Sequence, residues 1–211
     1  LTRAGLDTVG LRVPGHPVTQ AILKAAGRPV AAPSANRSGH VSPTTAAHVL
    51  ADLDGRIDAV VDGGPTDVGV ESTIVACLGS TLVLLRPGGV PRAALEAILG
   101  RPLAAATGEA TIAPGMLASH YAPNAAIRLD ATTVEPGEAL LAFGPDVPAG
   151  AAAVLNLSPS GDLAEAAASL FGFLRTLDAS GASRIAVMPI PAEGLGEAIR
   201  DRLARAAAPR D

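Results

Sequence analysis

Two short loops place small residues and polar side chains directly beside apolar runs of the chain. One loop reads Ala-Pro-Ser-Ala-Asn over residues 32–36, and the other reads Gly-Val-Glu-Ser-Thr over residues 69–73. Their hydroxyl, amide and carboxylate groups, with the backbone N–H groups, can hydrogen-bond a small ligand. A plain Ser/Asn turn or a polar start of a strand explains the same residues. Each loop by itself therefore leaves a ligand site and a structural turn as alternatives.

Two arginines lie where a charged side chain is unexpected. Arg12 interrupts the otherwise apolar run at residues 9–13, and Arg86 follows the apolar run at residues 82–85. A guanidinium that faces the interior needs an anion, and its fork fits a carboxylate or a phosphate. A guanidinium that faces water needs no ligand. The residues alone leave both alternatives open for each arginine.

Signatures of several enzyme classes are absent from the sequence. It contains no G-x-x-x-x-G-K-[ST] phosphate loop and no G-x-S-x-G nucleophile elbow. The four histidines have no H-E-x-x-H or comparable spacing of zinc ligands. We therefore assign no catalytic side chain and no metal ligand.

Composition limits the classes of partner. The 211 residues are 48% hydrophobic and only 2% aromatic, so the core must consist mainly of Leu, Val, Ile and Ala. The net charge is -4 with no basic run, which argues against a nucleic-acid-binding surface. A single cysteine, Cys77, excludes an internal disulfide and is typical of the reducing cytoplasm, where we expect the protein. No apolar run reaches the roughly 18 residues that span a membrane.

Apolar spacing and turn residues predict strands and helices in the first half of the chain. We expect strands at residues 8–13, 29–32, 57–61, 72–78 and 82–85, and helices at residues 16–26, 44–53 and 91–99. Thr44 is the expected N-cap of the second helix, and Gly27 and Gly100 are expected to end the first and the third. This order predicts α/β or α+β layering.

The pattern changes after residues 101–123, which are rich in Ala, Gly, Thr and Pro and are predicted to form a linker. Beyond the linker we expect strands at residues 125–129, 139–143, 152–157 and 184–189, and helices after Asp162 and at residues 195–207. The strand–helix–strand–helix order predicts a small, mostly parallel α/β domain.

The order of the motifs along the chain is more specific than any one of them. The series runs Thr-Val-Gly-Leu-Arg-Val-Pro (8–14), Ala-Pro-Ser-Ala-Asn-Arg-Ser-Gly (32–39), Ser-Pro-Thr-Thr (42–45), Asp-Gly-Gly (62–64), Gly-Val-Glu-Ser-Thr-Ile (69–74) and Leu-Arg-Pro-Gly (85–88). This series resembles the YrdC-like threonylcarbamoyl-AMP synthases. Ala-Pro-Gly-Met at residues 113–116 and His-Tyr-Ala-Pro at residues 120–123 are similar to the linker of the longer, two-domain branch of that family.

The resemblance implies an α/β fold with two domains. Residues 1–102 would form the C-terminal part of a YrdC-like twisted-sheet α/β domain, residues 103–123 a linker or lid, and residues 124–211 a small Rossmann-like α/β domain. Enzymes of this family are nucleotidyltransferases that condense L-threonine, bicarbonate or CO2, and ATP into threonylcarbamoyl-adenylate and pyrophosphate. The adenylate feeds t6A37 modification of tRNA through downstream threonylcarbamoyl-transfer machinery. Mg2+ is expected on the ATP phosphates.

The same resemblance implies a set of ligand contacts. L-Threonine would be held by Arg12, Ser72 and the backbone at Ala32. ATP or the adenylate would be held by Thr8, Ser34, Ser42, Arg86 and Tyr121. Because Tyr121 comes from the linker, residues 114–123 are expected to act as a lid that keeps water from a hydrolysable mixed anhydride.

One departure from the family pattern bears on the activity of the chain. The catalytic domain of the family begins with a front portion whose Lys/Arg motif contacts the nucleotide phosphates, and the sequence shows no counterpart. We therefore expect the chain to begin within that domain and to lack part of the phosphate-binding site and several core strands. Exposed strand edges at that point would favour aggregation.

Two other functions stay open. One is a non-catalytic module of the same fold that binds nucleotide or RNA, although the lack of basic excess argues against RNA and leaves direct tRNA binding undecided. The other is a carbamoyl-transfer domain related to those of hydrogenase maturation. The His-Tyr-Ala-Pro linker argues against the second, because it suits the two-domain synthases.

Overall fold

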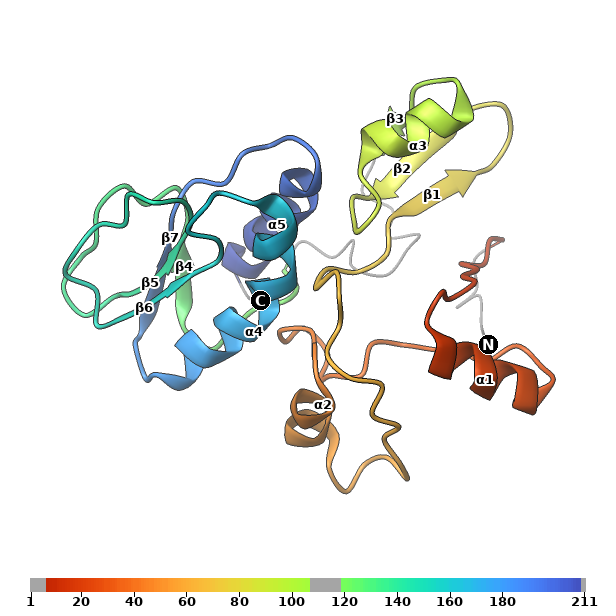
Figure 1. Ribbon diagram of the computed structural model, residues 1–211, viewed down its shortest axis with the longest axis horizontal. Helices are drawn as coiled ribbons and strands as arrows, with labels where there is room; N and C mark the ends of the chain where they lie inside the picture. Colours follow the sequence, from red (N-terminus) through yellow and green to blue (C-terminus); the bar gives the residue numbers. More distant parts are fainter. Residues whose placement is uncertain (1–6, 107–118, 210–211) are drawn as a thin grey trace.

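The computed structural model describes residues 7–106 and 119–209. Its strands form a three-stranded sheet in the order β1-β2-β3 and a four-stranded sheet in the order β4-β7-β5-β6, and Figure 1 shows the two sheets in separate parts of the molecule. The elements are α1 (Pro17–Ala26), α2 (Ala46–Leu53), β1 (Ile74–Cys77), β2 (Leu82–Arg86), α3 (Arg92–Leu99), β3 (Ala104–Ala105), β4 (Ala126–Arg128), β5 (Ala139–Ala142), β6 (Ala153–Asn156), α4 (Leu163–Ala179), β7 (Arg184–Val187) and α5 (Leu195–Ala207). None of the described helices is long and apolar enough to cross a membrane.

The elements from β4 to α5, which we call the C-terminal unit, follow the expected pattern closely. Every strand pair in its sheet is parallel, and β5 lies between β7 and β6. All of β5 is inaccessible to solvent, because α4 and α5 pack on one side of the sheet and a second apolar cluster covers the other. Asp162 begins α4 by accepting hydrogen bonds from the backbone N–H groups of Ala164 and Glu165. The predicted parallel α/β architecture is confirmed.

The N-terminal unit, residues 7–105, contains the smaller sheet. β1 and β2 pair antiparallel across the turn between Cys77 and Leu82, and β2 pairs in parallel with the short β3. The helix α1 ends at Gly27 and α3 ends at Gly100, both in the left-handed conformation that favours glycine, as expected. Among the described residues, Leu82, Leu84 and Leu103 form a small buried core beneath this sheet, and Val75 and Leu95 pack against it.

Several expectations for the N-terminal unit are wrong. Residues 8–13, 29–32 and 57–61 are irregular and form no strand. Leu11 and Val13, which would have packed in a sheet, are 89% and 93% exposed. The reason is that strand pairing is non-local, and the described residues provide no neighbouring strand for these segments.

The predicted cap of α2 is also displaced by one residue. Thr45, not Thr44, accepts the hydrogen bond from the backbone N–H of His48, while Thr44 Oγ1 lies 3.2 Å from His48 Nδ1. Adjacent threonines offer the same hydroxyl, so the backbone conformation of Thr45 decided which one caps the helix. The linker motif at residues 113–116 lies outside the described residues.

Candidate functional site

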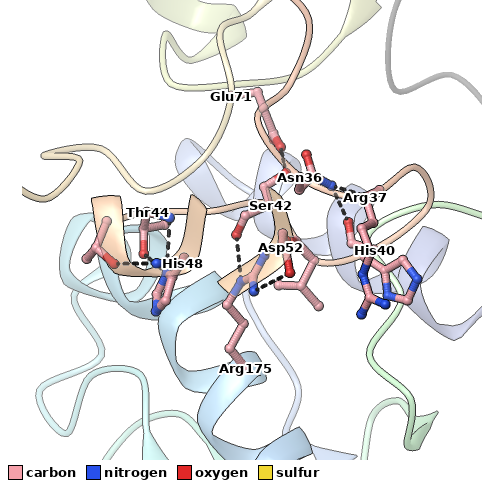
Figure 2. Close-up of polar contacts among 11 residues, drawn as sticks. Asn36, Arg37, His40, Ser42, Thr44, His48, Asp52, Glu71 and Arg175 are labelled. Atoms are coloured by element: carbon pink, nitrogen blue, oxygen red, sulfur yellow. Dashed lines mark hydrogen bonds and ion pairs between the residues drawn. The ribbon is translucent and has the colours of Figure 1, made fainter. Parts of the chain in front are cut away.

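The second polar loop contacts the motif that follows the first polar loop. Ser42, in the motif that follows the first loop, donates from Oγ to Oε1 of Glu71 in the second loop at 2.6 Å (Figure 2). Asn36 stabilises the turn between them, because its Nδ2 donates to the carbonyl oxygens of Arg37 and His40 at 2.9 and 3.0 Å. A hydroxyl and a carboxylate that lie 29 residues apart are thus held together, and the Asn36 amide stabilises the turn that precedes Ser42.

The C-terminal unit holds the second loop in position. Gly69 has a φ of 76°, and a Cβ at this position would lie 2.1 Å from the backbone oxygen of Ala167 in α4. Only glycine permits this approach. The next residue, Val70, packs against the core cluster of the C-terminal unit, to which the buried Val41 also belongs. Helix α4 therefore determines where Glu71 is presented.

The loop is closed from the other side by the turn after β2. Gly89 donates its backbone N–H to the carbonyl of Glu71 at 3.0 Å. A Cβ on Gly88 would lie 2.3 Å from that carbonyl oxygen, so the turn needs glycine to pack this tightly. Arg86 is buried and donates from Nε and Nη2 to the carbonyl of Ser72 at 3.2 and 2.8 Å. Burial, which disfavours the charged form, lowers the pKa of Arg86.

Arg202 on α5 is the residue that the sequence analysis missed. Its side chain is fully buried, and its Nε donates to Oε2 of Glu71 at 2.6 Å while its Nη2 donates to the carbonyl of Pro87 at 2.9 Å. One feature of the sequence could have identified Arg202. It lies between Ile199 and Ala206 on the apolar stripe of the helix, where a charged side chain requires a buried partner.

Tyr121 lies against this arginine. The Arg202 Cζ atom is 5.2 Å from the centroid of the Tyr121 ring, and the ring stacks on Phe171 with a centroid separation of 5.6 Å. Tyr121 is 1% exposed and has a φ of 63°, which is rare for a large side chain. Its buried hydroxyl forms no well-aligned hydrogen bond within residues 7–106 and 119–209, but it lies close enough to the Arg86 guanidinium to raise the pKa of that arginine against the effect of burial. Tyr121 and Arg86 can therefore act on the same ligand.

Charge balance keeps Glu71 ionised. Burial alone would raise its pKa, but the charge of Arg202 and the hydrogen bonds from Arg202 and Ser42 more than offset burial, and the net shift is downward. For Tyr121, burial and the nearby Glu71 charge raise the pKa. At neutral pH the cluster therefore holds a carboxylate, a neutral phenol and two buried guanidinium groups. These groups can bind and neutralise charged ligands, whereas an ionised Glu71 already bonded twice is unsuited to act as a general acid.

The remaining predicted contacts are not part of this cluster. Thr8, Arg12, Ala32 and Ser34 lie in the irregular stretches on either side of α1, and the side chains of Arg12 and Ser34 are exposed. The side chain of Ser72 is also exposed, although its carbonyl accepts from Arg86. The structure thus brings together Ser42, Arg86, Tyr121 and the backbone of Ser72. That these residues bind L-threonine and ATP stays a prediction.

A cavity of about 230 Å3 lies beside Val41, between the units. It is lined by Arg37, His40 and Asp52 on one side and by Arg175 and Asp178 on the other. Arg175 Nη2 binds Asp52 Oδ2 at 2.6 Å, and its Nε donates to the Ser42 carbonyl at 3.4 Å, as Figure 2 shows. No group of three or more His, Cys, Asp or Glu side chains in the described part of the chain could hold a metal ion.

Two family models match this sequence. One, described as telomere recombination, covers residues 1–88, and the other, described as the threonylcarbamoyl-AMP synthase C-terminal domain, covers residues 90–208. The chain belongs to the threonylcarbamoyl-AMP synthase family. The resemblance based on motif order is thereby confirmed.

Individual members of the synthase family match nearly all of the chain. The threonylcarbamoyl-AMP synthase of Bacillus subtilis is 40% identical over 98% of this chain and 65% of that protein. The synthase of Pyrococcus abyssi is 37% identical over 96% of this chain and 64% of that protein. The chain thus spans slightly less than two thirds of the length of these relatives.

Solved structures of the family agree in fold. A crystal structure of P. abyssi Sua5 complexed with L-threonine matches with a TM-score of 0.86 and 34% identity, over 97% of this chain and 65% of that chain. A P. abyssi Sua5 variant, in which a histidine and the tyrosine after it are replaced by alanine, matches with a TM-score of 0.84 and 32% identity, over 96% of this chain and 64% of that chain. The mixed α/β fold expected from the sequence is confirmed.

Proposed function

We propose that this protein is an L-threonylcarbamoyladenylate synthase, a nucleotidyltransferase that uses L-threonine, bicarbonate or CO2, and ATP. Its product would feed t6A37 modification of tRNA. The observation that carries the proposal is the contact of Ser42 with Glu71 beside Arg86 and Tyr121 in a member of the synthase family. The complex of P. abyssi Sua5 with L-threonine supports threonine as the amino-acid substrate.

The cluster suits this chemistry because the reaction needs alignment and charge neutralisation rather than a protein nucleophile. The amine of threonine forms a C–N bond with CO2 and loses a proton to solvent, which yields a carbamate. A carbamate oxygen then attacks the α-phosphorus of ATP, the bond from that phosphorus to the bridging oxygen breaks, and pyrophosphate leaves. Buried Arg86 can neutralise negative charge on the phosphates, and Tyr121 Oη can donate to an acceptor on the ligand.

We assign the contacts as the family motifs suggest. Arg12, Ala32 and Ser72 would bind L-threonine, and Thr8, Ser34, Ser42, Arg86 and Tyr121 would bind ATP or the adenylate. Mg2+ would enter with the ATP phosphates, because both oxygens of Glu71 are occupied by protein donors and the described residues provide no metal cluster. We also propose a cytoplasmic location, a catalytic domain that ends at residue 102 and a linker that ends at residue 123.

The role of Tyr121 has one further support. His120–Tyr121 is the single place in the sequence where tyrosine follows histidine. The P. abyssi Sua5 variant whose structure is known carries alanine at a histidine and the tyrosine after it. We infer that the two pairs correspond and that Tyr121 belongs to the working site.

Pyrophosphate release from ATP tests the function. In the full-length gene product we expect release that requires both L-threonine and bicarbonate, with omission of either substrate as the control. Absence of release under these conditions would contradict the synthase activity. Tight RNA binding that weakens steeply with salt, without pyrophosphate release, would instead favour a non-catalytic binding module.

A further inference from the structure

We propose that Arg202 on α5 is a positioning residue, through which the C-terminal unit holds Glu71 and the Tyr121 ring in the arrangement that substrate binding requires. The inference rests on the proposed function, because it concerns the same site. It assigns to the C-terminal unit a direct part in forming that site, beyond covering the N-terminal unit.

Arg202 connects three segments that are far apart in the sequence. Its Nε binds Glu71 Oε2 at 2.6 Å, its Nη2 binds the carbonyl of Pro87 at 2.9 Å, and its Cζ lies 5.2 Å from the Tyr121 ring centroid. Its Nη1 donates to Asp201, which also accepts from Arg205 Nε at 3.0 Å. The planar guanidinium makes these contacts in fixed directions, which a lysine ammonium could not reproduce.

Glu71 depends on this arginine for its orientation. Each of its oxygens has one side-chain donor, Ser42 for Oε1 and Arg202 for Oε2, both at 2.6 Å. Without Arg202, a largely buried carboxylate would keep only a neutral donor, and it would turn away or take up a proton. Either change would move the backbone of Ser72, whose carbonyl accepts from Arg86, and would free the face of Tyr121.

A second ion pair on the same helix provides a matched control. Glu197 of α5 accepts from Arg92 of α3 at 2.7 Å and so also joins the two units. Both side chains are about one third exposed, and within residues 7–106 and 119–209 the hydrogen bonds of the Arg92 and Glu197 side chains go to each other and to the carbonyl of Leu103, not to the cluster around Glu71. Loss of this pair removes a contact between the units and leaves the cluster around Glu71 in place. The change in activity that it causes therefore measures how much the contact between the two units contributes by itself.

The experiment compares Arg202→Lys, Arg202→Met and Glu197→Gln in the full-length gene product. We expect kcat/KM for L-threonine to fall at least tenfold in both Arg202 variants and to change less than twofold in Glu197→Gln. Combining Arg202→Met with Glu71→Gln should lower kcat/KM no further than Arg202→Met alone, because each change removes the same ion pair between Arg202 and Glu71. Equal loss of thermal stability in Arg202→Lys and Glu197→Gln, with kcat/KM unchanged in both, would overturn the positioning role.

A readout that needs no activity separates this inference from the proposed function. For this readout the same variants are made in the 211-residue chain, which has one tyrosine and no tryptophan, so that its near-ultraviolet circular dichroism reports chiefly on Tyr121. We expect the tyrosine band to change in Arg202→Lys, whose charge is retained, and to stay unchanged in Glu197→Gln. An unaltered band in both Arg202 variants would overturn the inference. Missing pyrophosphate release by the wild-type gene product would contradict only the proposed function.

Discussion

Ser42 Oγ donates a 2.6 Å hydrogen bond to Glu71 Oε1 and thereby joins two motifs that lie 29 residues apart. The other oxygen of Glu71 accepts from Arg202 of the C-terminal unit. A single carboxylate thus connects the motif at residues 42–45 and the loop at residues 69–73 to a helix that is formed more than 120 residues later. The candidate site is therefore a property of both units together.

Replacing Ser42 with alanine should weaken this connection. The variant removes one of the hydrogen bonds that hold the pKa of Glu71 down, so that pKa should rise. We expect the free energy of unfolding to fall by about 1 kcal/mol, the usual net worth of a hydrogen bond to a partly buried group. Urea unfolding at neutral pH measures the loss. Ser38→Ala is the control, because Ser38 is exposed, and equal stability of the two variants would contradict the prediction.

Replacing Tyr121 with phenylalanine should separate packing from ligand binding. The ring contacts with Phe171 and Arg202 are retained, and only a buried hydroxyl that lies near Arg86 without a well-aligned hydrogen bond among the described residues is lost. We expect the thermal midpoint to stay the same or to rise slightly. The KM for ATP in the pyrophosphate assay should rise several-fold, because the hydroxyl is assigned to the nucleotide. An unchanged KM would remove Tyr121 Oη from the proposed contacts.

Replacing Arg12 with methionine should affect binding and leave stability unchanged. Arg12 is exposed and forms no ion pair within the described part of the chain, so the free energy of unfolding should change by less than about 0.5 kcal/mol. If Arg12 binds the threonine carboxylate, the KM for L-threonine should rise at least tenfold, while the KM for ATP changes little. Arg28→Met, at another exposed arginine, is the control. The same KM for L-threonine in both variants would exclude the assignment.

Glu138 should make the C-terminal unit sensitive to acid. Its hydrogen bond from Arg128, assisted by a backbone N–H and by nearby charges, lowers its pKa from 4.5 to about 2 despite burial. The unfolded chain therefore takes up this proton at higher pH than the folded chain. The stabilisation is complete above about pH 4.5 and is lost as the pH falls towards 2.

Unfolding experiments over this pH range test the prediction. Glu138→Gln should flatten the acid dependence and should lower the free energy of unfolding at pH 7, because Arg128 loses its partner. Glu135→Gln is the control, since Glu135 is more than half exposed and its ion pairs should contribute little. A wild-type acid dependence that persists in Glu138→Gln would assign the effect to other groups.

The local patterns of the sequence predicted the C-terminal unit well. The apolar runs at β5 and β7, the cap at Asp162 and the helical spacing of α4 and α5 are encoded within each segment. A parallel sheet buried on both faces needs such continuous apolar strands, so the architecture followed from order and composition. The segments at residues 8–13 and 29–32 carried the same kind of signal and formed no strand, because a strand also depends on a neighbour that its own residues do not specify.

The sequence by itself determined the family, the motif order and the presence of Ser42, Arg86 and Tyr121 among the candidate contacts. The tertiary structure alone decided that Glu71 lies at the centre of them and that Arg202 completes its surroundings. The two residues are separated by 131 positions, and no local pattern specifies a contact across such a distance. Gly69 and Val70 pack against α4 and the core of the C-terminal unit. This packing brings the Glu71 carboxylate beside Arg202, the buried arginine of α5.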